Sequence, residues 1–318
     1  MSHDVKSIPM NRTQEMEREK PQENRRTVKD WINLEKHRIR MYLHHPGSLI
    51  MRILVLLSAV VTVSVLVYLV LYILIHGVPY LSKDLFSIEY TSENVSMLPA
   101  MINTLLMTLA ALLIAVPLGI GSAIYLTEYA KRGNKLVEIV RLTTETLSGI
   151  PSIVYGLFGS LFFVTALHWR LSLLSGACTL SIMVLPVIMR TTEEALMAVP
   201  DSYREGSFGL GAGRLRTVFR IVLPAAVPGI LSGIILAVGR IVGETAALIY
   251  TAGTATKIVH GCFDSARTLS VHMYALSNEG MHTNEAYATA VVLLVIVLLI
   301  NALSSFIARK CSGGGERD

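Results

Sequence analysis

The chain has 318 residues, of which 52% are hydrophobic and only 16% are charged. Soluble globular proteins carry about a quarter charged residues, so the composition excludes an ordinary soluble protein and indicates several membrane-spanning segments. The net charge of +5 does not require a nucleic-acid partner, because basic residues on the inner side of a membrane are sufficient to explain it.

Long apolar segments alternate with polar connections along the chain. A helix needs about 20 mainly apolar residues to cross a bilayer, and the third and fifth segments are interrupted by Pro or Gly. The first is not a signal peptide, because a polar stretch of about 45 residues precedes it and its apolar core is too long. We predict an all-α polytopic membrane protein with six transmembrane helices, at about 49–76, 100–126, 136–167, 171–190, 218–240 and 287–308.

Polar tails flank the predicted membrane domain, which covers residues 46–310. Residues 1–45 have the composition of a partly disordered tail, and 311–318 form a second, short tail. Between Val28 and Met41 basic residues are interspersed with apolar ones. This part fits either an interfacial amphipathic helix or a solvated basic segment leading into the first span.

The distribution of Lys and Arg predicts the orientation in the membrane. Basic residues accumulate on the cytoplasmic side of membrane proteins. With a cytoplasmic amino terminus, 23 of the 28 Lys and Arg residues fall on the inner side. Both termini and the loop 193–217 are therefore expected in the cytoplasm. The five basic residues left on the outer side are Lys83, Arg170, Arg240, Lys257 and Arg267.

The cytoplasmic loop 193–217 has the pattern of a short, rigid helix. Asp201 or Ser202 can cap its start with Glu205 as the partner of a capping box. Glycines at 209, 211 and 213 then allow the chain to reverse direction through positive φ. Such an element fits a docking point for a partner that moves it, although a helix–turn–helix without a special role fits the same pattern.

Motifs for catalysis and nucleotide binding are missing from the sequence. It contains no Gly-x4-Gly-Lys-Ser/Thr phosphate loop, and neither a His-Glu-x-x-His nor a Gly-x-Ser-x-Gly motif. We therefore expect a non-catalytic chain without cofactor or metal, which relies on a partner for ATP hydrolysis. His260, His272 and His282 lack metal-site spacing and are expected to be solvated or interfacial.

The loop and the residues after it resemble a known family. Membrane permeases of binding-protein-dependent ABC importers carry a motif of Glu-Ala-Ala, three further residues, Gly, nine further residues and Ile-x-Leu-Pro. This chain resembles them, because the same spacing starts at Glu205, with Gly206 and Ser207 in place of the two alanines. The resemblance implies a type I ABC importer-like permease fold and a coupling helix that fits a groove on an ATPase subunit. The implied coupling residues are Arg204, Glu205, Gly206, Ser207, Gly211, Ile221, Leu223 and Pro224.

Arg240, Glu244 and the adjacent Thr245 lie at the outer end of the fifth apolar segment. Arg240 and Glu244 are spaced to share one helical face and pair. Ionisable groups in such segments are costly, and they usually face a partner or a water-filled path. One interpretation is an ion pair that stabilises the helix end. The other is an anion pathway, because Arg suits oxyanions and Glu can accept a hydrogen bond from phosphate that still bears a proton, which sulfate lacks.

Two segments narrow the resemblance to the phosphate-uptake permeases. These are 149–159 and 239–248, while 286–290 resembles the A-type subunit of that pair. The resemblance implies one permease subunit of an ATP-driven importer of inorganic phosphate, forming half of the pathway in the bacterial cytoplasmic (inner) membrane. The implied partners are a homologous C-type permease, two copies of an ATP-binding subunit and a periplasmic or surface phosphate-binding protein, besides membrane lipid.

Other functions stay open at this point. A permease for another oxyanion, such as sulfate or molybdate, fits the same motifs. An ion-coupled secondary transporter fits less well. It would predict inverted repeats with paired broken helices and a midplane ion site, whereas the sequence has one Arg/Glu face rather than a set of carboxylates. The connection 240–287 predicts re-entrant or interfacial helices. For Glu145, which precedes the Gly-Ile-Pro-Ser break, a structural role is favoured over a gating one.

Overall fold

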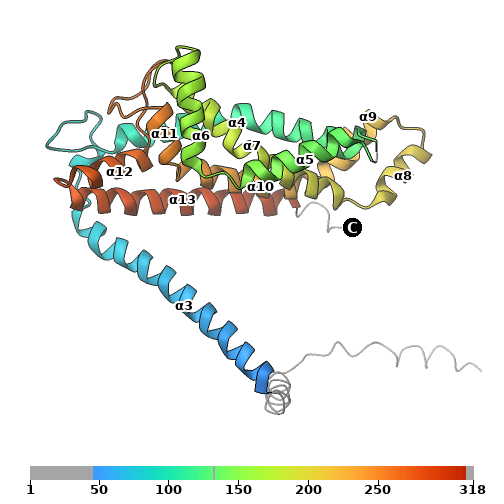
Figure 1. Cartoon of the computed structure of the whole chain (residues 1–318), viewed down its shortest axis with the longest axis horizontal. Coiled ribbons are helices and arrows are strands. Elements are labelled where there is room, and N and C mark those ends of the chain that lie inside the picture. The colour runs from blue at the N-terminus through green and yellow to red at the C-terminus, as the bar shows by residue number, and fades with distance from the viewer. Residues whose placement is uncertain (1–45, 132, 313–318) are drawn as a thin grey trace, which may run out of the picture. The chain divides into compact units, whose positions relative to one another are not determined.

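The computed structural model of the protein describes residues 46–131 and 133–312, and within these ranges every regular element is helical (Figure 1). The predicted tail 1–45, with its possible interfacial helix, and residues 313–318 lie outside the described residues. The last helix continues to Ser312, two residues into the predicted carboxyl-terminal tail.

The first described helix, α3 (Pro46–Gly77), has 32 residues with no acidic residue in its first turn. Its candidate span has a mean hydropathy of 2.8, as expected of a helix that crosses a bilayer. The chain divides into two units, residues 1–68 and 69–318, and the boundary falls within α3. In the second unit Gly77 packs on Tyr287, where a Cβ atom would clash with the carbonyl group.

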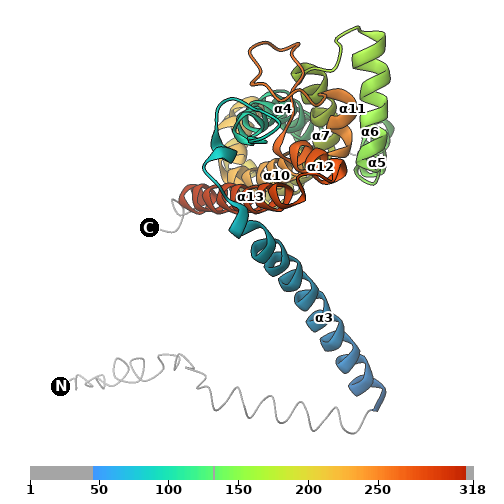
Figure 2. The same cartoon turned by 90° about the vertical axis from the view of Figure 1, so that its left-hand side faces the viewer.

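A bundle of long helices makes up most of the second unit (Figures 1 and 2). α7 (Leu173–Met197) is its central helix, because 61% of its most hydrophobic window is buried, against 22–33% for the other long helices of the bundle. The first of those helices is α4 (Leu98–Ile124), which continues into the π-turn η3 (Tyr125–Tyr129). The second is formed by α9 (Arg214–Thr217), the π-turn η5 (Val218–Val222) and α10 (Leu223–Val242), and the third is α13 (Thr283–Ser312).

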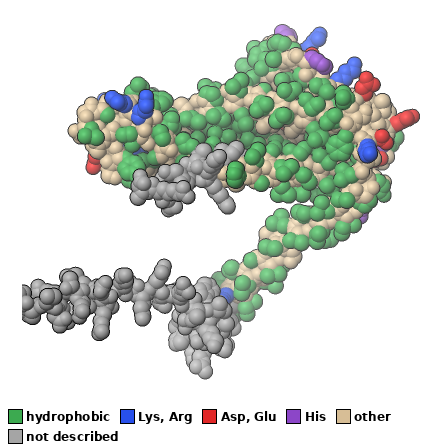
Figure 3. Space-filling view, turned by 180° about the vertical axis from the view of Figure 1, so that it is seen from behind, with side chains coloured by type: hydrophobic (Ala, Val, Ile, Leu, Met, Phe, Trp, Pro, Cys, Tyr) green, Lys and Arg blue, Asp and Glu red, His purple; other side chains and the backbone are tan. Residues whose placement is uncertain are grey.

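The surface of the bundle has the polarity of a membrane protein. On the face shown in Figure 3, hydrophobic side chains cover the length of the bundle, while charged side chains gather at its two ends. Exposed apolar residues of this kind occur along α4, α10 and α13, for example Leu113, Leu236 and Leu299. Large exposed apolar surface is unfavourable in water, so the surface between the ends suits lipid or a membrane partner.

One apolar segment is sharply bent. It consists of α5 (Lys135–Ser148) and α6 (Ser152–Gly159), and α6 continues into η4 (Ser160–Ala166). The helix axis bends by 104° between α5 and α6. Pro151 lies at the break, where it disfavours helical backbone in the residue before it. The hydroxyl of Tyr155 donates to the carbonyl of Leu147 at 2.7 Å across the bend. Residues 46–131 and 133–312 thus contain five unbroken candidate spans, or six if the bent pair counts as one.

Shorter elements close the two ends of the bundle. α8 (Asp201–Gly209) lies at one end, and α11 (Ala246–Thr251) and α12 (Leu269–Glu279) lie at the other (Figure 1). Asn103 of α4 stabilises the second end, since its amide donates to the Lys257 carbonyl and accepts from the Val259 amide. Two single turns, η1 (Val78–Tyr80) and η2 (Asp84–Phe86), belong to the same end.

Candidate coupling helix and candidate anion pathway

The start of α8 differs from the predicted capping box. Pro200 occupies the N-cap position, with φ −55° and ψ 138°, and no side chain caps the helix. Asp201 lies inside the first turn, where its negative charge interacts favourably with the positive end of the helix dipole. It also forms an ion pair with Arg204 at 3.2 Å. The capping-box prediction for Asp201, Ser202 and Glu205 is therefore wrong, because a proline holds the position that the polar side chain would need.

The end of α8 is a Schellman turn. The amide of Gly211 donates to the carbonyl of Phe208 at 2.9 Å, and the amide of Ala212 donates to that of Ser207 at 3.1 Å. Gly211 has a φ of +82°, which side chains rarely adopt. Of the three glycines predicted to reverse the chain, Gly211 alone has positive φ. The motif glycine is thus explained by backbone geometry.

The two residues that replace the alanines of the motif have different surroundings. Ser207 is buried, and its hydroxyl lies 2.8 Å from that of Thr217 at the end of α9. Gly206 is exposed, and a Cβ atom placed on it would meet nothing within 4 Å. Position 207 therefore packs α8 against the chain that follows it, while position 206 faces open space.

Arg204 connects α8 to two other segments. Its Nη2 donates to Oε1 of Glu128 in η3 at 2.7 Å, and its Nε donates to the same oxygen at 3.1 Å. Nη2 also donates to the carbonyl of Leu196, in the last turn of α7, at 2.9 Å. Nη1 donates to the carbonyl of Val199, just beyond that helix, at 2.8 Å. Both charged side chains are largely buried, with 16% and 9% exposed. Bonds between ionised groups are stronger than neutral ones, so α8 is held firmly.

Sequence reasoning identified Arg204 but missed Glu128. The two residues are 76 positions apart, and no periodic pattern connects them. The available signal was a carboxylate just past the end of an apolar segment, in Thr127-Glu128-Tyr129.

The outward side of α8 is apolar for an exposed helix. Leu210 has 92% of its surface exposed, and Tyr203 and Phe208 have 53% and 47%. Glu205 is exposed beside them. An exposed apolar patch with a charged group is typical of a protein-docking surface. The predicted coupling residues therefore divide into an inward set, Arg204 and Ser207, and an outward set with Glu205.

The remaining motif residues lie where α10 begins. Ile221 belongs to η5, and Leu223 and Pro224 are the first two residues of α10. Proline has no backbone N–H and interrupts the helical hydrogen-bond ladder, and the wider π-turn η5 ends just before it. Pro224 is exposed, while Ile221 and Leu223 are partly buried.

Arg240, Glu244 and Thr245 lie at the opposite end of the bundle from α8. α10 ends at Val242, and the amide of Glu244 donates to the Ile241 carbonyl in a tighter turn. Glu244 is buried, and its Oε1 accepts from the amide of Ala247 at 3.1 Å, at the start of α11. The predicted pairing on one helical face is therefore wrong in this structure, because the helix ends between the two residues.

Arg240 is left with a free guanidinium group. It is partly buried in the last turn of α10 and makes neither a hydrogen bond nor an ion pair with the residues at 46–131 and 133–312. Thr245 is the N-cap residue of α11, without a side-chain cap bond. The end of α10 thus presents a cation with unused donors next to a fixed carboxylate, a combination that can bind an anion bearing a proton.

A buried histidine lies at the end of the bundle that carries α11 and α12, contrary to the expectation that the histidines are solvated or interfacial. His272 of α12 is 1% exposed, and its Nδ1 lies 3.5 Å from Nη1 of Arg267. The guanidinium of Arg267 also stacks 5.7 Å from the centre of the Tyr90 ring. Burial, and then the charge of Arg267, lower the pKa of His272 to about 4.

Comparison with known proteins identifies the family. Residues 115–312 match the family described as the binding-protein-dependent transport system inner membrane component. The chain belongs to this family. The Bacillus subtilis (strain 168) member named probable ABC transporter permease protein YqgI is 35% identical over 263 residues, covering 77% of this chain and 89% of the relative. The phosphate transport system permease protein PstA of Haemophilus influenzae is 32% identical and covers 83% of this chain and 94% of its own.

Solved structures of ABC transporters share the fold of this family member. A chain of a bacterial alginate ABC transporter in complex with its alginate-bound periplasmic protein has a TM-score of 0.60 at 18% identity, covering 80% of this chain and 94% of that chain. A chain of the MetNI methionine ABC transporter, in an inward facing conformation, has a TM-score of 0.53 at 22% identity. The match covers 68% of this chain and 94% of that chain. The predicted fold, that of a type I ABC importer permease, is confirmed.

Proposed function

We propose that this permease is one of two membrane subunits of an ATP-driven importer of inorganic phosphate, and that a separate subunit hydrolyses ATP. The observation that carries the proposal is the 32% identity that extends over 94% of the Haemophilus influenzae phosphate transport system permease. The phosphate transport system permeases of Mycobacterium leprae and Yersinia pestis are likewise 34% and 36% identical to this chain. The implied complex contains a homologous C-type permease, two ATP-binding subunits and a phosphate-binding protein.

The end of the bundle that carries α8 faces the cytoplasm in this proposal. The excess of basic residues supports this orientation, because Arg204, Arg214, Arg216 and Arg220 all lie in or next to the α8 region. Both termini are then cytoplasmic, in a bacterial inner membrane. The ATPase reaches α8 from this side, and the binding protein delivers phosphate at the end that carries α11 and α12.

The ATPase drives the permease by displacing α8. Its groove receives the outward side of the helix, with Leu210, Phe208 and Glu205. The inward side transmits the displacement, because the bonds of Arg204 attach α8 to the end of α7 and to η3. A helix that is fixed at its base by several charged hydrogen bonds moves together with its supports rather than independently of them.

Arg240 and Glu244 contribute one half of an anion pathway, with Thr245 beside them. The free guanidinium of Arg240 supplies planar donors for an oxyanion. Glu244 accepts a hydrogen bond from the proton that phosphate still bears at neutral pH, and it repels fully deprotonated sulfate. The C-type permease supplies the other half of the pathway.

Uptake of labelled phosphate by cells that lack this chain tests the cargo. We expect the chain to restore uptake, and excess sulfate or molybdate to leave it unchanged. Competition by either anion as strong as that by unlabelled phosphate would reassign the permease to another oxyanion. Glu244→Gln is expected to reduce the preference for phosphate over sulfate, and an unchanged preference would remove Glu244 from the proposal. Deletion of residues 201–213 should abolish uptake while the spans stay in the membrane.

A further inference from the structure

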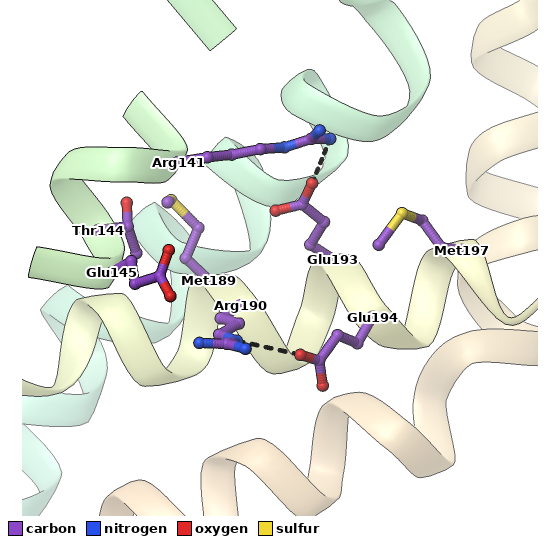
Figure 4. A pocket seen from close by; sticks show the side chains of 8 residues that line it. All are labelled: Arg141, Thr144, Glu145, Met189, Arg190, Glu193, Glu194 and Met197. Carbon is purple, nitrogen blue, oxygen red and sulfur yellow. Dashed lines mark hydrogen bonds and ion pairs between the residues drawn. The ribbon is translucent and has the colours of Figure 1, made fainter. Parts of the chain in front are cut away.

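A charged pocket is lined by α5 and α7, and neither Arg204 nor Arg240 is among its lining residues. Its volume is about 240 Å³. Figure 4 shows its lining, in which charged side chains from the two helices face one another across the gap. Ionisable groups on apolar membrane segments are costly unless protein or water surrounds them. The charged residues that line the pocket are Arg141 and Glu145 of α5, and Arg190, Glu193 and Glu194 of α7.

Two ion pairs in this pocket have different structural consequences. Arg190 and Glu194 pair at 3.1 Å within α7, and about 60% of each side chain is exposed. Arg141 and Glu193 pair between α5 and α7, and the side chain of Glu193 is only 10% exposed. Within the described ranges, it is the one ion pair that connects these two helices. Loss of Arg141 would leave a mostly buried carboxylate without its partner.

Apart from this pair and the bond from Tyr155 to the Leu147 carbonyl, α5 has few stabilising contacts. No residue of the helix is buried, and Val137 and Leu147 contact the core with partly buried side chains. Its first turn is capped by Asn134, whose side chain accepts from the Leu136 amide at 3.0 Å. A helix with few buried apolar contacts moves at low energetic cost, so the ion pair with α7 determines much of its position.

The same end of α7 is bonded to α8. Arg204 donates to the carbonyls of Leu196 and Val199. Glu193 lies three residues before Leu196, which is less than one helical turn away. A displacement of α8 therefore moves the turn of α7 that carries Glu193, and the ion pair extends this movement to Arg141 on α5.

We propose that the Arg141–Glu193 ion pair transmits the displacement of α8 to α5 and so controls the width of the pocket between α5 and α7. Arg141 and Glu193 are positioning residues, because they act by moving α5 and need no contact with the transported anion. The inference rests on the proposed function, since α8 is displaced only by an ATPase that docks on it.

Accessibility of a single cysteine in the pocket tests this transmission. Thr144 lines the pocket on α5, so Thr144→Cys is introduced after Cys178, Cys262 and Cys311 have been replaced by alanine. The complete complex in membrane vesicles is treated with a water-soluble maleimide, without nucleotide and after trapping with ATP and vanadate. With the ion pair intact, we expect labelling rates that differ by roughly fivefold or more between the two states, a coupling typical of linked sites.

Charge exchange separates the ion pair from general packing. Arg141→Gln should remove the difference between the two states, and Arg141→Glu combined with Glu193→Arg should restore it. Arg190→Gln is the matched control, because it breaks the pair within α7 at the same pocket and should leave the difference intact. A difference that survives Arg141→Gln, a failed restoration, or an equal effect of Arg190→Gln would overturn the inference.

A second measurement applies if Arg141→Gln prevents assembly of the complex. Cysteines at Thr144 and Met189, which line the pocket from opposite helices, are joined by a disulfide in the otherwise unaltered protein. Phosphate uptake should fall, and a reductant should restore it; uptake that continues at the unlinked rate refutes a moving α5.

Failure of this inference can be told apart from failure of the proposed function. The labelling rate does not depend on which anion is transported, so it responds even if phosphate is not the cargo. If the unaltered complex shows no nucleotide-dependent difference at all, the coupling through α8 fails and the inference fails with it. If the difference exists but ignores Arg141, the inference alone fails.

Discussion

Arg204 and Arg240 lie at opposite ends of the same bundle, and their surroundings are opposite as well. Arg204 is mostly buried and donates to a carboxylate and to main-chain carbonyls. Arg240 is partly buried and has no hydrogen-bond or ion-pair partner among the residues that the structure describes. An arginine whose donors are all used fixes the structure around it, whereas one with unused donors is available to a ligand. The comparison supports the proposal that the end with α8 is driven by the ATPase and that the end of α10 selects the anion.

The largest effect is expected from Arg204→Ala. It leaves Glu128 buried without its partner, which costs about 3–5 kcal/mol for a buried pair, and it also removes the donors to the end of α7. We expect less complex in the membrane and a lower unfolding temperature, measured by immunoblot and by thermal unfolding of the purified complex. Glu128→Ala should have a similar effect. Wild-type levels in both variants would show that the Arg204 network does not hold α8.

At the other end, acid should destabilise the region around His272. Its pKa is lowered to about 4 from an ordinary value of 6.5, so the folded state favours the neutral ring. This stability is complete above pH 6.5 and is lost as the pH falls toward 4, up to about 3 kcal/mol at 1.36 kcal/mol per pKa unit. Hydrogen exchange of α12 between pH 7 and pH 4.5 measures the loss. His272→Gln should flatten the pH dependence, and an unchanged profile would contradict the prediction.

Arg240→Gln directly tests the proposed role of Arg240 in anion selection. A hydrogen bond to a charged group is worth about 1.5–3 kcal/mol, which corresponds to a reduction in uptake of roughly 10- to 150-fold at 1.4 kcal/mol per factor of ten. Because Arg240 has no hydrogen-bond or ion-pair partner in the described ranges, the amount of complex in the membrane should stay near the wild-type level. Loss of the complex together with uptake would instead indicate a structural arginine.

The smallest effects distinguish the two glycines of α8. Gly211→Ala forces a side chain into left-handed backbone at a cost of about 1–2 kcal/mol. Gly206→Ala meets open space and should stabilise the helix by about 0.5–1 kcal/mol. Thermal unfolding of the complex should therefore shift in opposite directions. Equal shifts would contradict the Schellman turn at the end of α8.

Much of the fold follows from local sequence. Long apolar runs predict helices wherever they occur, and the spacing from Glu205 to Pro224 predicts the family. The 104° bend was not predictable, although Pro151 marks the break, because the angle depends on how α6 packs and on the bond from Tyr155 to Leu147. The Arg204–Glu128 pair was hidden for a related reason, since tertiary packing brings together residues that are distant in sequence.

Two site predictions failed because local rules compete. Pro200 occupies the N-cap position of α8, so Asp201 lies in the first turn of the helix and does not cap it. A helix end at Val242 separated Arg240 from Glu244, whose side chain instead accepts from the amide of Ala247. Asp201 and Glu244 thus have partners other than the predicted ones, namely Arg204 and the amide of Ala247. The free guanidinium of Arg240 is a consequence that residue spacing could not show.

The most direct test measures ATP hydrolysis and uptake of radiolabelled phosphate together in the reconstituted complex. If α8 drives and the end of α10 selects, Arg204→Lys should lower both rates in parallel, because the ATPase no longer engages a firmly held helix. Arg240→Gln should lower uptake and leave hydrolysis nearly unchanged, so that more ATP is used per phosphate. The opposite pattern, or normal uptake in Arg240→Gln, would contradict the division of roles between the two ends.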